Sequence, residues 1–221
     1  MNHKNDKYWD ELFNKLECFA QDIETPSVSI LALEKATPFM LLISTILSLR
    51  TKDEVTLASS RRLFKTASTP EEIIQLPTAT IEELIYPAGF YKRKAQQIKN
   101  ISHIIISKHK GAVPQSKEAL LELPGVGLKT TNLVLSLAFN IPAICVDTHV
   151  HRIANRMGWI STKTAEESEP ALSAVLPLQY WIPVNEYLVV YGQNICKPTS
   201  PYCSICMFTN SCPKIAVTKS R

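Results

Sequence analysis

The chain has 221 residues, enough to bury a sizeable core as one large domain or two small ones. Its 45% hydrophobic and 20% charged content is that of an ordinary globular protein, and its 6 glycines are too few for the turns of an all-β chain. The net charge is only +4, but residues 50–129 carry thirteen basic and eight acidic side chains, which suits a polyanionic partner as well as it suits a solvated lysine-rich surface.

The N-terminal sequence MNHKNDKYWDELF is polar and amphipathic, which is not the pattern of a signal peptide. No apolar run reaches the roughly 20 residues that span a bilayer. We therefore expect a cytoplasmic protein with no membrane partner. In a reducing compartment, its six cysteines are better explained by metal or cluster binding than by disulfides.

Helical spacing of apolar residues is the dominant pattern along the chain. It covers residues 8–20, 38–49, 55–64, 79–85, 92–108 and 116–123. The sequence PFMLLISTILSL at residues 38–49 is apolar on nearly every face, which predicts a central helix, although a buried strand has the same composition. Thr69, Pro70 and Glu72 have the order of a helix start. The sequence predicts an all-α fold of seven to ten short helices, with one brief extended segment possible at 141–146.

Four of the six cysteines lie close together in the pattern Cys-x6-Cys-x2-Cys-x5-Cys, at Cys196, Cys203, Cys206 and Cys212. Thiolates suit zinc or iron-sulfur clusters. A structural zinc site more often uses two close pairs, and here there is one close pair with two outliers, so the spacing favours a 4Fe-4S cluster. The other two cysteines, Cys18 and Cys145, are expected to be buried as small hydrophobic residues.

A tight turn between two helical stretches is predicted at Pro124-Gly125-Val126-Gly127, within LELPGVGLKTTNLVLSLAF. Two glycines let the backbone come close to a phosphate, and the following helix presents N–H groups and its positive dipole end to that phosphate. Such contacts recognise the DNA backbone without reading the bases. The alternative is a structural turn between helices, for which one glycine would usually be enough.

Lys129 and Asp147 are the two candidate catalytic residues. Lys129 falls in the first turn of the helix after the turn, where the helix dipole disfavours a cation and so favours a neutral, nucleophilic amine. A phosphate contact or a plain exposed lysine is the alternative. Asp147 lies in ICVDTHVHR, where it is either a helix N-cap or a carboxylate held opposite Lys129. His149 and His151 lack the spacing of a metal pair and are interpreted as polar packing or DNA-backbone contacts.

Taken together, LPGVGLKTTNLV, VDTHVHR and the cysteine pattern resemble the endonuclease III family of helix-hairpin-helix DNA glycosylases. The resemblance extends to LLISTILSLRTKDEV and GFYKRKAQQI, and so covers nearly the whole chain. It implies a six-helix barrel over residues 31–141 that contains the hairpin. It also implies a second helical domain, made from residues 1–30 and 142–221, in which the four cysteines hold the 4Fe-4S cluster.

The resemblance implies a bifunctional DNA glycosylase and abasic-site lyase of base excision repair, acting as a monomer on nucleoid DNA. A damaged base, expected to be an oxidised pyrimidine, is flipped out of double-stranded DNA. Lys129 attacks the sugar C1′ with the help of Asp147, and β-elimination from the resulting Schiff base cuts the strand. The cluster is expected to be structural or DNA-binding, with no part in bond cleavage.

Three alternatives stay open to different degrees. The adenine glycosylase branch shares the fold but lacks a catalytic lysine after the hairpin, so Lys129 argues against it. A thymine- or uracil-mismatch glycosylase of the same fold is harder to exclude. A non-catalytic DNA-binding or redox iron-sulfur protein would leave the coincidence of Lys129 and Asp147 accidental.

The chain departs from the family at the two loops that probe the space left by the flipped base. A glutamine and a leucine are usual there, whereas alignment with this sequence places Arg50 and Phe90. Phe90 would be a flat apolar wedge, and Arg50 a donor-only group that favours guanine opposite the lesion or turns aside to a phosphate. The resemblance thus implies DNA contacts from Arg50, Phe90, Gly125, Val126, Gly127 and His149.

Overall fold

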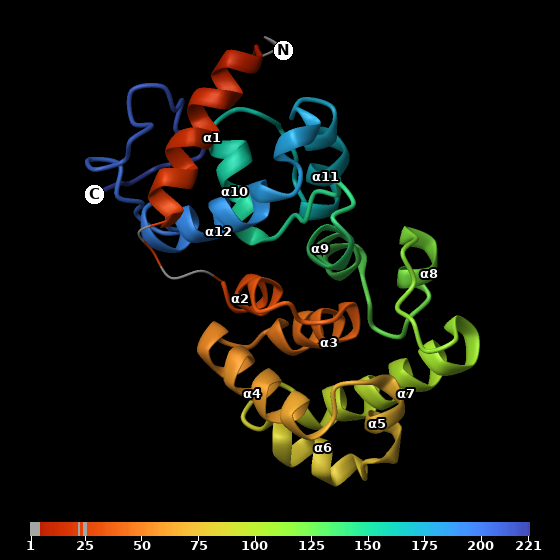
Figure 1. Cartoon of the computed structure of the whole chain (residues 1–221). Helices are drawn as coiled ribbons and strands as arrows, with labels where there is room; N and C mark the ends of the chain where they lie inside the picture. Colours follow the sequence, from red (N-terminus) through yellow and green to blue (C-terminus); the bar gives the residue numbers. More distant parts are fainter. Residues whose placement is uncertain (1–4, 22, 24–25) are drawn as a thin grey trace. The chain divides into compact units, whose positions relative to one another are not determined.

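The structure, a computed structural model, describes residues 5–21, 23 and 26–221. Over these residues it contains twelve α-helices, one 3-10 helix and no strand, which confirms the all-α prediction (Figure 1). The helices outnumber the seven to ten expected because three of them have only five to seven residues, too few for a periodic pattern to establish. Residues 1–4 of the polar N-terminal sequence, and residues 22, 24 and 25 of the predicted 1–30 segment, lie outside the described ranges.

None of the helices in the described ranges combines the length and the apolar character needed to cross a membrane. The chain divides into two compact units, residues 26–141 and residues 1–25 with 142–221. Residues 141–146, the candidate extended segment, form no strand.

The unit of residues 26–141 is built around α3 (Pro38–Ser48). Thr37 caps its N-terminus by accepting a hydrogen bond from the Met40 N–H at 3.2 Å. The side chains of Leu42, Ile43, Ile46 and Leu47 have no solvent exposure. Residues 39 and 41–47 are all buried and together cover every face of the helix. Helix α3 is accordingly surrounded by other helices, namely α2 (Ser27–Leu33), α4 (Asp53–Thr66), α7 (Tyr91–His109) and α9 (Leu128–Phe139). The central-helix interpretation of PFMLLISTILSL is confirmed, and the buried-strand alternative is wrong.

Three shorter helices complete this unit: α5 (Pro70–Gln75), α6 (Thr78–Ile85) and α8 (Lys117–Leu121). The predicted helix start at Thr69 is confirmed, since Thr69 and Glu72 form a capping box at the N-terminus of α5. Both α5 and α6 pack on α7, and α8 packs on α9. Six isoleucines of α5, α6 and α7 have no solvent exposure, namely Ile73, Ile81, Ile85, Ile98, Ile101 and Ile105.

The other unit contains α1 (Asp6–Gln21), α10 (Thr148–Arg156), α11 (Ala165–Ser173), the 3-10 helix η1 (Leu178–Tyr180) and α12 (Pro183–Asn194). Helix α12 packs against both α10 and α1. Aromatic residues dominate the core: the Trp9 and Trp159 rings meet edge to face with centroids 5.2 Å apart, and Phe13 stacks on Tyr180 at 4.0 Å. After α12 the chain continues without further helix, so packing and side-chain contacts must hold residues 195–221.

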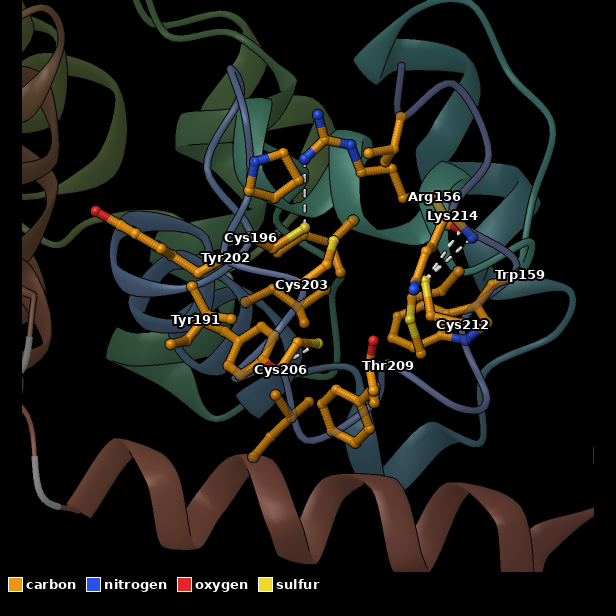
Figure 2. Close-up of a pocket in the computed structure, with 18 residues that line it drawn as sticks. Arg156, Trp159, Tyr191, Cys196, Tyr202, Cys203, Cys206, Thr209, Cys212 and Lys214 are labelled. Carbon is orange, nitrogen blue, oxygen red and sulfur yellow. Dashed lines mark hydrogen bonds between the residues drawn. The ribbon is translucent and has the colours of Figure 1, made fainter. Parts of the chain in front are cut away.

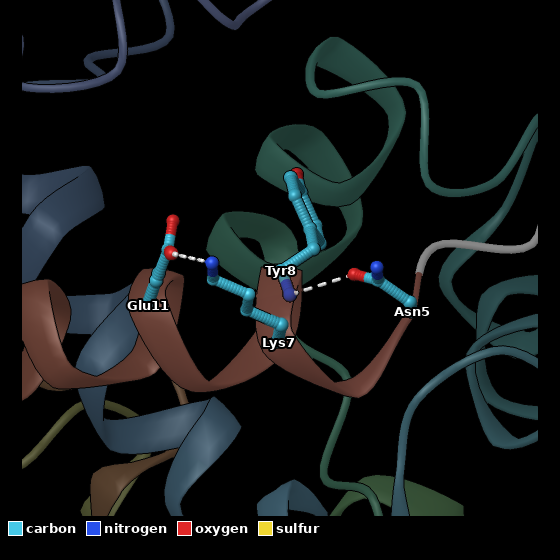
Figure 3. Close-up of polar contacts among 4 residues, drawn as sticks. All are labelled: Asn5, Lys7, Tyr8 and Glu11. Atoms are coloured by element: carbon cyan, nitrogen blue, oxygen red, sulfur yellow. Dashed lines mark hydrogen bonds and ion pairs between the residues drawn. The ribbon is translucent and has the colours of Figure 1, made fainter.

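Helix α1 begins with a polar cap (Figure 3). The Asn5 side chain accepts a hydrogen bond from the Tyr8 N–H at 3.0 Å. One turn along, Lys7 and Glu11 form an ion pair at 3.9 Å, which is solvent-exposed and contributes little to stability. The helix is held mainly by its apolar face, Trp9, Leu12, Phe13 and Leu16, in the core.

Candidate functional site

The hairpin joins α8 to α9 through a turn that contains both predicted glycines. Gly125 has φ +71°, and a Cβ there would lie 2.6 Å from the Gln97 Nε2. That nitrogen donates a hydrogen bond to the Pro124 carbonyl at 2.9 Å, which fixes its position. Both the backbone conformation and the neighbouring side chain therefore require glycine at residue 125.

Gly127 is different, although it lies only two residues later. It is the N-cap of α9, it has φ −99°, and no atom lies within 4 Å of where its Cβ would be. Neither backbone conformation nor packing within the chain requires a glycine here. The missing side chain leaves open space in front of a helix N-terminus, where N–H groups and the positive dipole end attract anions.

The three residues of the hairpin turn that were predicted to contact DNA differ in solvent exposure. Gly125 and Gly127 are exposed, whereas Val126 is 5% exposed, and its N–H donates to the Leu123 carbonyl at 3.1 Å. Val126 therefore shapes the turn from inside. Lys129, the second residue of α9, is exposed on the same end of that helix.

Asp147 is the N-cap of α10, as the cap interpretation predicted. Its Oδ1 accepts hydrogen bonds from the N–H groups of His149 at 2.8 Å and Val150 at 2.9 Å. Both hydrogen bonds end on Oδ1, so Oδ2 takes no part in the cap. Asp147 belongs to the unit with α1 and α10, and Lys129 to the unit of residues 26–141.

His149 lies half-buried against Arg152, with 3.1 Å between its Nδ1 and the arginine Nη2. Gly192 in α12 makes room for it, since a Cβ there would lie 2.4 Å from the His149 Nδ1. His151 contacts the Ser168 hydroxyl at 2.7 Å, which agrees with polar packing. The sequence analysis did not single out Gly192.

The four clustered cysteines line one pocket with about 530 Å³ of unfilled space, its open mouth included (Figure 2). All four are free thiols. The remaining lining is largely apolar, with Leu16, Ile153, Met157, Leu188 and Phe208 among its members. Burial raises the pKa of Cys212, and the nearby thiols Cys206, Cys196 and Cys203 add to that shift. Over the described residues, no three His, Cys, Asp or Glu side chains are placed to hold a single metal ion.

Several hydrogen bonds end on these sulfurs. The Arg156 Nη1 donates to the Cys196 Sγ at 3.4 Å, the Lys214 N–H donates to the Cys212 Sγ at 3.4 Å, and the Tyr191 hydroxyl lies 3.1 Å from the Cys206 Sγ. A pocket of four thiols, with a guanidinium and N–H donors beside them, fits a thiolate-bound cluster, because such donors balance its negative charge.

Two arginines of α10 connect that helix to residues 196–212, the cysteine segment. Arg156 is 9% exposed and donates to the carbonyls of Lys197 at 2.7 Å and Pro198 at 2.8 Å. Arg152, one turn earlier, donates to the Cys196 carbonyl at 2.8 Å. Sequence analysis missed both. The i, i+4 spacing of two arginines on a short amphipathic helix before the cysteines was the available signal.

Comparison with known proteins agrees with this geometry. Residues 43–177 match the family model of the HhH-GPD superfamily base excision DNA repair proteins. Endonuclease III of Thermotoga maritima is 48% identical over 81% of this chain and 84% of its own length. The chain belongs to the endonuclease III family.

Two solved structures of the family in complex with DNA share this fold. A non-covalent endonuclease III–DNA complex has a TM-score of 0.80 and 32% identity, over 93% of this chain and 95% of the other. A trapped endonuclease III–DNA covalent intermediate with an estranged adenine has a TM-score of 0.76 and 36% identity, over 80% and 84%. This family member is a bifunctional DNA glycosylase and abasic-site lyase of base excision repair.

Arg50 and Phe90, the two residues that the resemblance aligns with a glutamine and a leucine, lie side by side. The Arg50 guanidinium carbon is 5.7 Å from the centroid of the Phe90 ring, within reach of a cation–π contact. Both side chains are exposed, Phe90 to 61%. Two exposed groups from distant parts of the sequence therefore meet at one surface of the unit of residues 26–141.

Proposed function

We propose that the enzyme excises damaged pyrimidines, above all oxidised ones, from double-stranded DNA and cuts the abasic strand through a Schiff base on Lys129. The observation that carries the proposal is the pairing of Gly127 and Lys129. Gly127 leaves space that the chain itself does not need in front of α9, and Lys129 is exposed two residues later. A phosphate at this helix end would bring a deoxyribose toward the lysine amine.

In the proposed reaction, the Lys129 nitrogen forms a bond to C1′ while the glycosidic bond breaks and its electron pair leaves with the base. The Asp147 carboxylate accepts a proton from the lysine nitrogen and stabilises positive charge on the sugar. The sugar ring then opens: the C1′–O4′ bond breaks, O4′ takes up a proton, and the lysine nitrogen forms the Schiff base with C1′. Loss of a C2′ proton from the Schiff base expels the 3′ phosphate, and water releases the lysine. The trapped covalent intermediate of a relative supports this sequence.

We also propose that Cys196, Cys203, Cys206 and Cys212 hold a 4Fe-4S cluster, supported by the shared pocket and by the donors to their sulfurs. Bound there, the cluster would link the parts of residues 196–212 to one another and pack against the other residues that line the pocket. The division into compact units supports a six-helix barrel domain at residues 31–141 and an iron-sulfur domain from residues 1–30 and 142–221.

Duplex DNA is the proposed partner of a monomeric, nucleoid-associated enzyme. Two solved structures of endonuclease III with DNA support this partner. The proposed contacts beyond Lys129 are Arg50, Phe90, Gly125, Val126, Gly127 and His149, with Val126 limited to its backbone because its side chain is buried.

The first test is borohydride trapping on abasic-site DNA. Lys129→Gln should abolish the covalent complex, because an amide cannot form a Schiff base, while binding to an uncleavable abasic analogue stays within a few-fold of wild type. Lys108→Gln, the same change at an exposed lysine of α7, is the matched control and should trap normally. Undiminished trapping by Lys129→Gln would show that another residue is the nucleophile.

The second test concerns the substrate. Duplexes that each carry one lesion are assayed separately for base release and for strand cutting, and we expect release of oxidised pyrimidines with coupled cutting. Release of thymine or uracil from mismatches, without release of oxidised pyrimidines, would favour a mismatch glycosylase instead. Asp147→Asn should lose base release by at least about 100-fold, because a neutral amide cannot stabilise the developing charge.

A further inference from the structure

Two segments of the unit of residues 26–141 each present an exposed side chain from a left-handed residue. Arg50, just beyond the end of α3, has φ +53°, and Phe90, the residue before α7, has φ +58°. This conformation costs about 1–2 kcal/mol for a residue other than glycine. Residues persist in it only when their surroundings hold them, so the contacts around the two segments need an explanation.

Lys94 contacts both segments from the first turn of α7. Its side chain is buried, with 5% exposure. The ammonium donates to the carbonyls of Leu47 at 2.8 Å and Leu49 at 2.7 Å, and to the Thr51 hydroxyl at 2.9 Å. These acceptors flank Arg50 on both sides. The backbone N–H of the same lysine donates to the Phe90 carbonyl at 3.0 Å.

Gly89 and Thr51 bring the two segments as close as their backbones allow. The Gly89 N–H donates to the Thr51 Oγ1 at 3.0 Å, so this hydroxyl accepts from both Gly89 and Lys94. A Cβ at Gly89 would lie 2.3 Å from the Arg50 carbonyl oxygen. Any larger residue at position 89 would therefore push the Arg50 and Phe90 segments apart.

The buried charge of Lys94 is balanced by carbonyls. Among the described residues, no carboxylate forms an ion pair with this ammonium. Instead the ammonium lies at the negative end of α3, where the carbonyls of the last turn point at it. Burial lowers the pKa of Lys94 to about 8, and at neutral pH the amine is still mainly protonated and donates three hydrogen bonds. Burying a cation costs more free energy than burying an apolar side chain of similar size, because the charge loses its hydration.

We propose that Lys94 is a positioning residue that fixes the separation of Arg50 and Phe90, so that the two side chains enter the duplex at the lesion as one unit. This inference rests on the proposed function of the enzyme on damaged DNA. Lys94 itself does not touch the DNA. It acts through the backbone on either side of Arg50 and through the Phe90 carbonyl.

The test uses two variants of Thr51, one of Lys94 and one of Lys108. Thr51→Val keeps the shape of the side chain but removes the acceptor shared by Lys94 and Gly89, whereas Thr51→Ser keeps the hydroxyl and serves as the matched control. Lys94→Met removes the ammonium, and Lys108→Met makes the same change at an exposed position of α7. If Lys94→Met does not fold, the two Thr51 variants decide the outcome.

The main readout is the fluorescence of 2-aminopurine placed opposite an abasic-site analogue in a duplex, which rises when inserted side chains unstack the base. Thr51→Val and Lys94→Met should weaken this rise and lower excision from duplex DNA by roughly 5-fold, the effect expected from losing one or two hydrogen bonds. Thr51→Ser and Lys108→Met should match wild type.

Borohydride trapping on single-stranded abasic DNA separates this proposal from the proposed function. A single strand has no opposite base to displace, so all four variants should keep this trapping within about 2-fold. If Thr51→Val gives the same fluorescence rise and duplex excision as Thr51→Ser, the positioning role is wrong. If the wild-type enzyme forms no borohydride-trapped complex with either duplex or single-stranded abasic DNA, the proposed function is wrong, whatever the fluorescence shows.

Discussion

Arg50 brings a permanent charge and five hydrogen-bond donors to a position that the family resemblance aligns with glutamine, which both donates and accepts. The Phe90 ring beneath its guanidinium limits the directions in which Arg50 can point. A donor-only group held in this way can pair with the two acceptors of guanine, O6 and N7, or turn to a phosphate. The two possibilities differ in whether the opposite base matters.

We expect wild type to excise a pyrimidine lesion best opposite guanine, and Arg50→Gln to reduce that preference by about 1–3 kcal/mol, the value of a good bidentate contact. Excision kinetics opposite each of the four bases provide the measurement. Arg50→Lys is the control, since it keeps the charge but loses the planar pair of donors. A uniform loss opposite all four bases in Arg50→Gln, restored by Arg50→Lys, would show a phosphate contact instead.

Single residues were predictable where the signal is local. The cap role of Asp147 follows from residue type and position, and the structure has it. Cys145 is 1% exposed, as expected, but the expectation that Cys18 is buried is wrong, because Cys18 is exposed. The apolar stripe of α1 runs through Trp9, Leu12, Phe13 and Leu16, and residue 18 falls outside it. Residue type alone misplaced this cysteine, whereas helical spacing would have placed it correctly.

Among the elements, the helix-turn-helix of α8 and α9 separates a glycine needed for folding from one available for function. Gly125 is required by its positive φ and by Gln97, whereas nothing in the chain requires Gly127. A single sequence shows the two glycines as equivalent. Only their backbone angles and neighbours distinguish them.

We therefore expect opposite effects from two alanine substitutions. Gly125→Ala should lower the free energy of unfolding by about 1–2 kcal/mol, the cost of the left-handed conformation. Gly127→Ala should leave stability unchanged or slightly higher, but should weaken binding to abasic-analogue duplex by several-fold, because the added methyl group occupies the space in front of α9. Thermal unfolding and binding titrations measure the two quantities. Normal DNA affinity in Gly127→Ala would remove the support that this residue gives to a phosphate site.

Elements with a strong periodic pattern were predicted well, and α3, α6 and α7 begin and end within a residue of the expected ranges. Contacts between elements were not, because they join residues far apart in the sequence. The meeting of Arg50 with Phe90 and the link from Lys94 to both segments depend on how α3 and α7 pack. No local pattern carries that information.

At the scale of the whole molecule, the unit that contains α1 ends in a long segment without regular secondary structure. Residues 195–221 contain no helix, yet the cysteine segment closes one side of a core that includes Leu16, Tyr191 and Phe208. Hydrogen bonds from Arg152 and Arg156 hold the start of this segment. A bound cluster would fix the rest, so cluster binding and folding of this unit should be coupled.

Cys206→Ser should therefore abolish the broad absorbance near 400 nm, a rough value for thiolate-bound clusters, and destabilise one unit more than the other. Hydrogen exchange should rise in α10, in α12 and over residues 195–217, and much less in α3 and α7, because those helices pack within the unit of residues 26–141. Cys18→Ser, the same substitution at an exposed cysteine outside the pocket, should keep both the colour and the exchange pattern.

A colourless wild-type enzyme with full activity and one zinc per chain would contradict the cluster. Equal exchange increases in both units of Cys206→Ser would show that the cysteine segment stabilises the whole chain, since a local cross-link should protect only the unit that contains it.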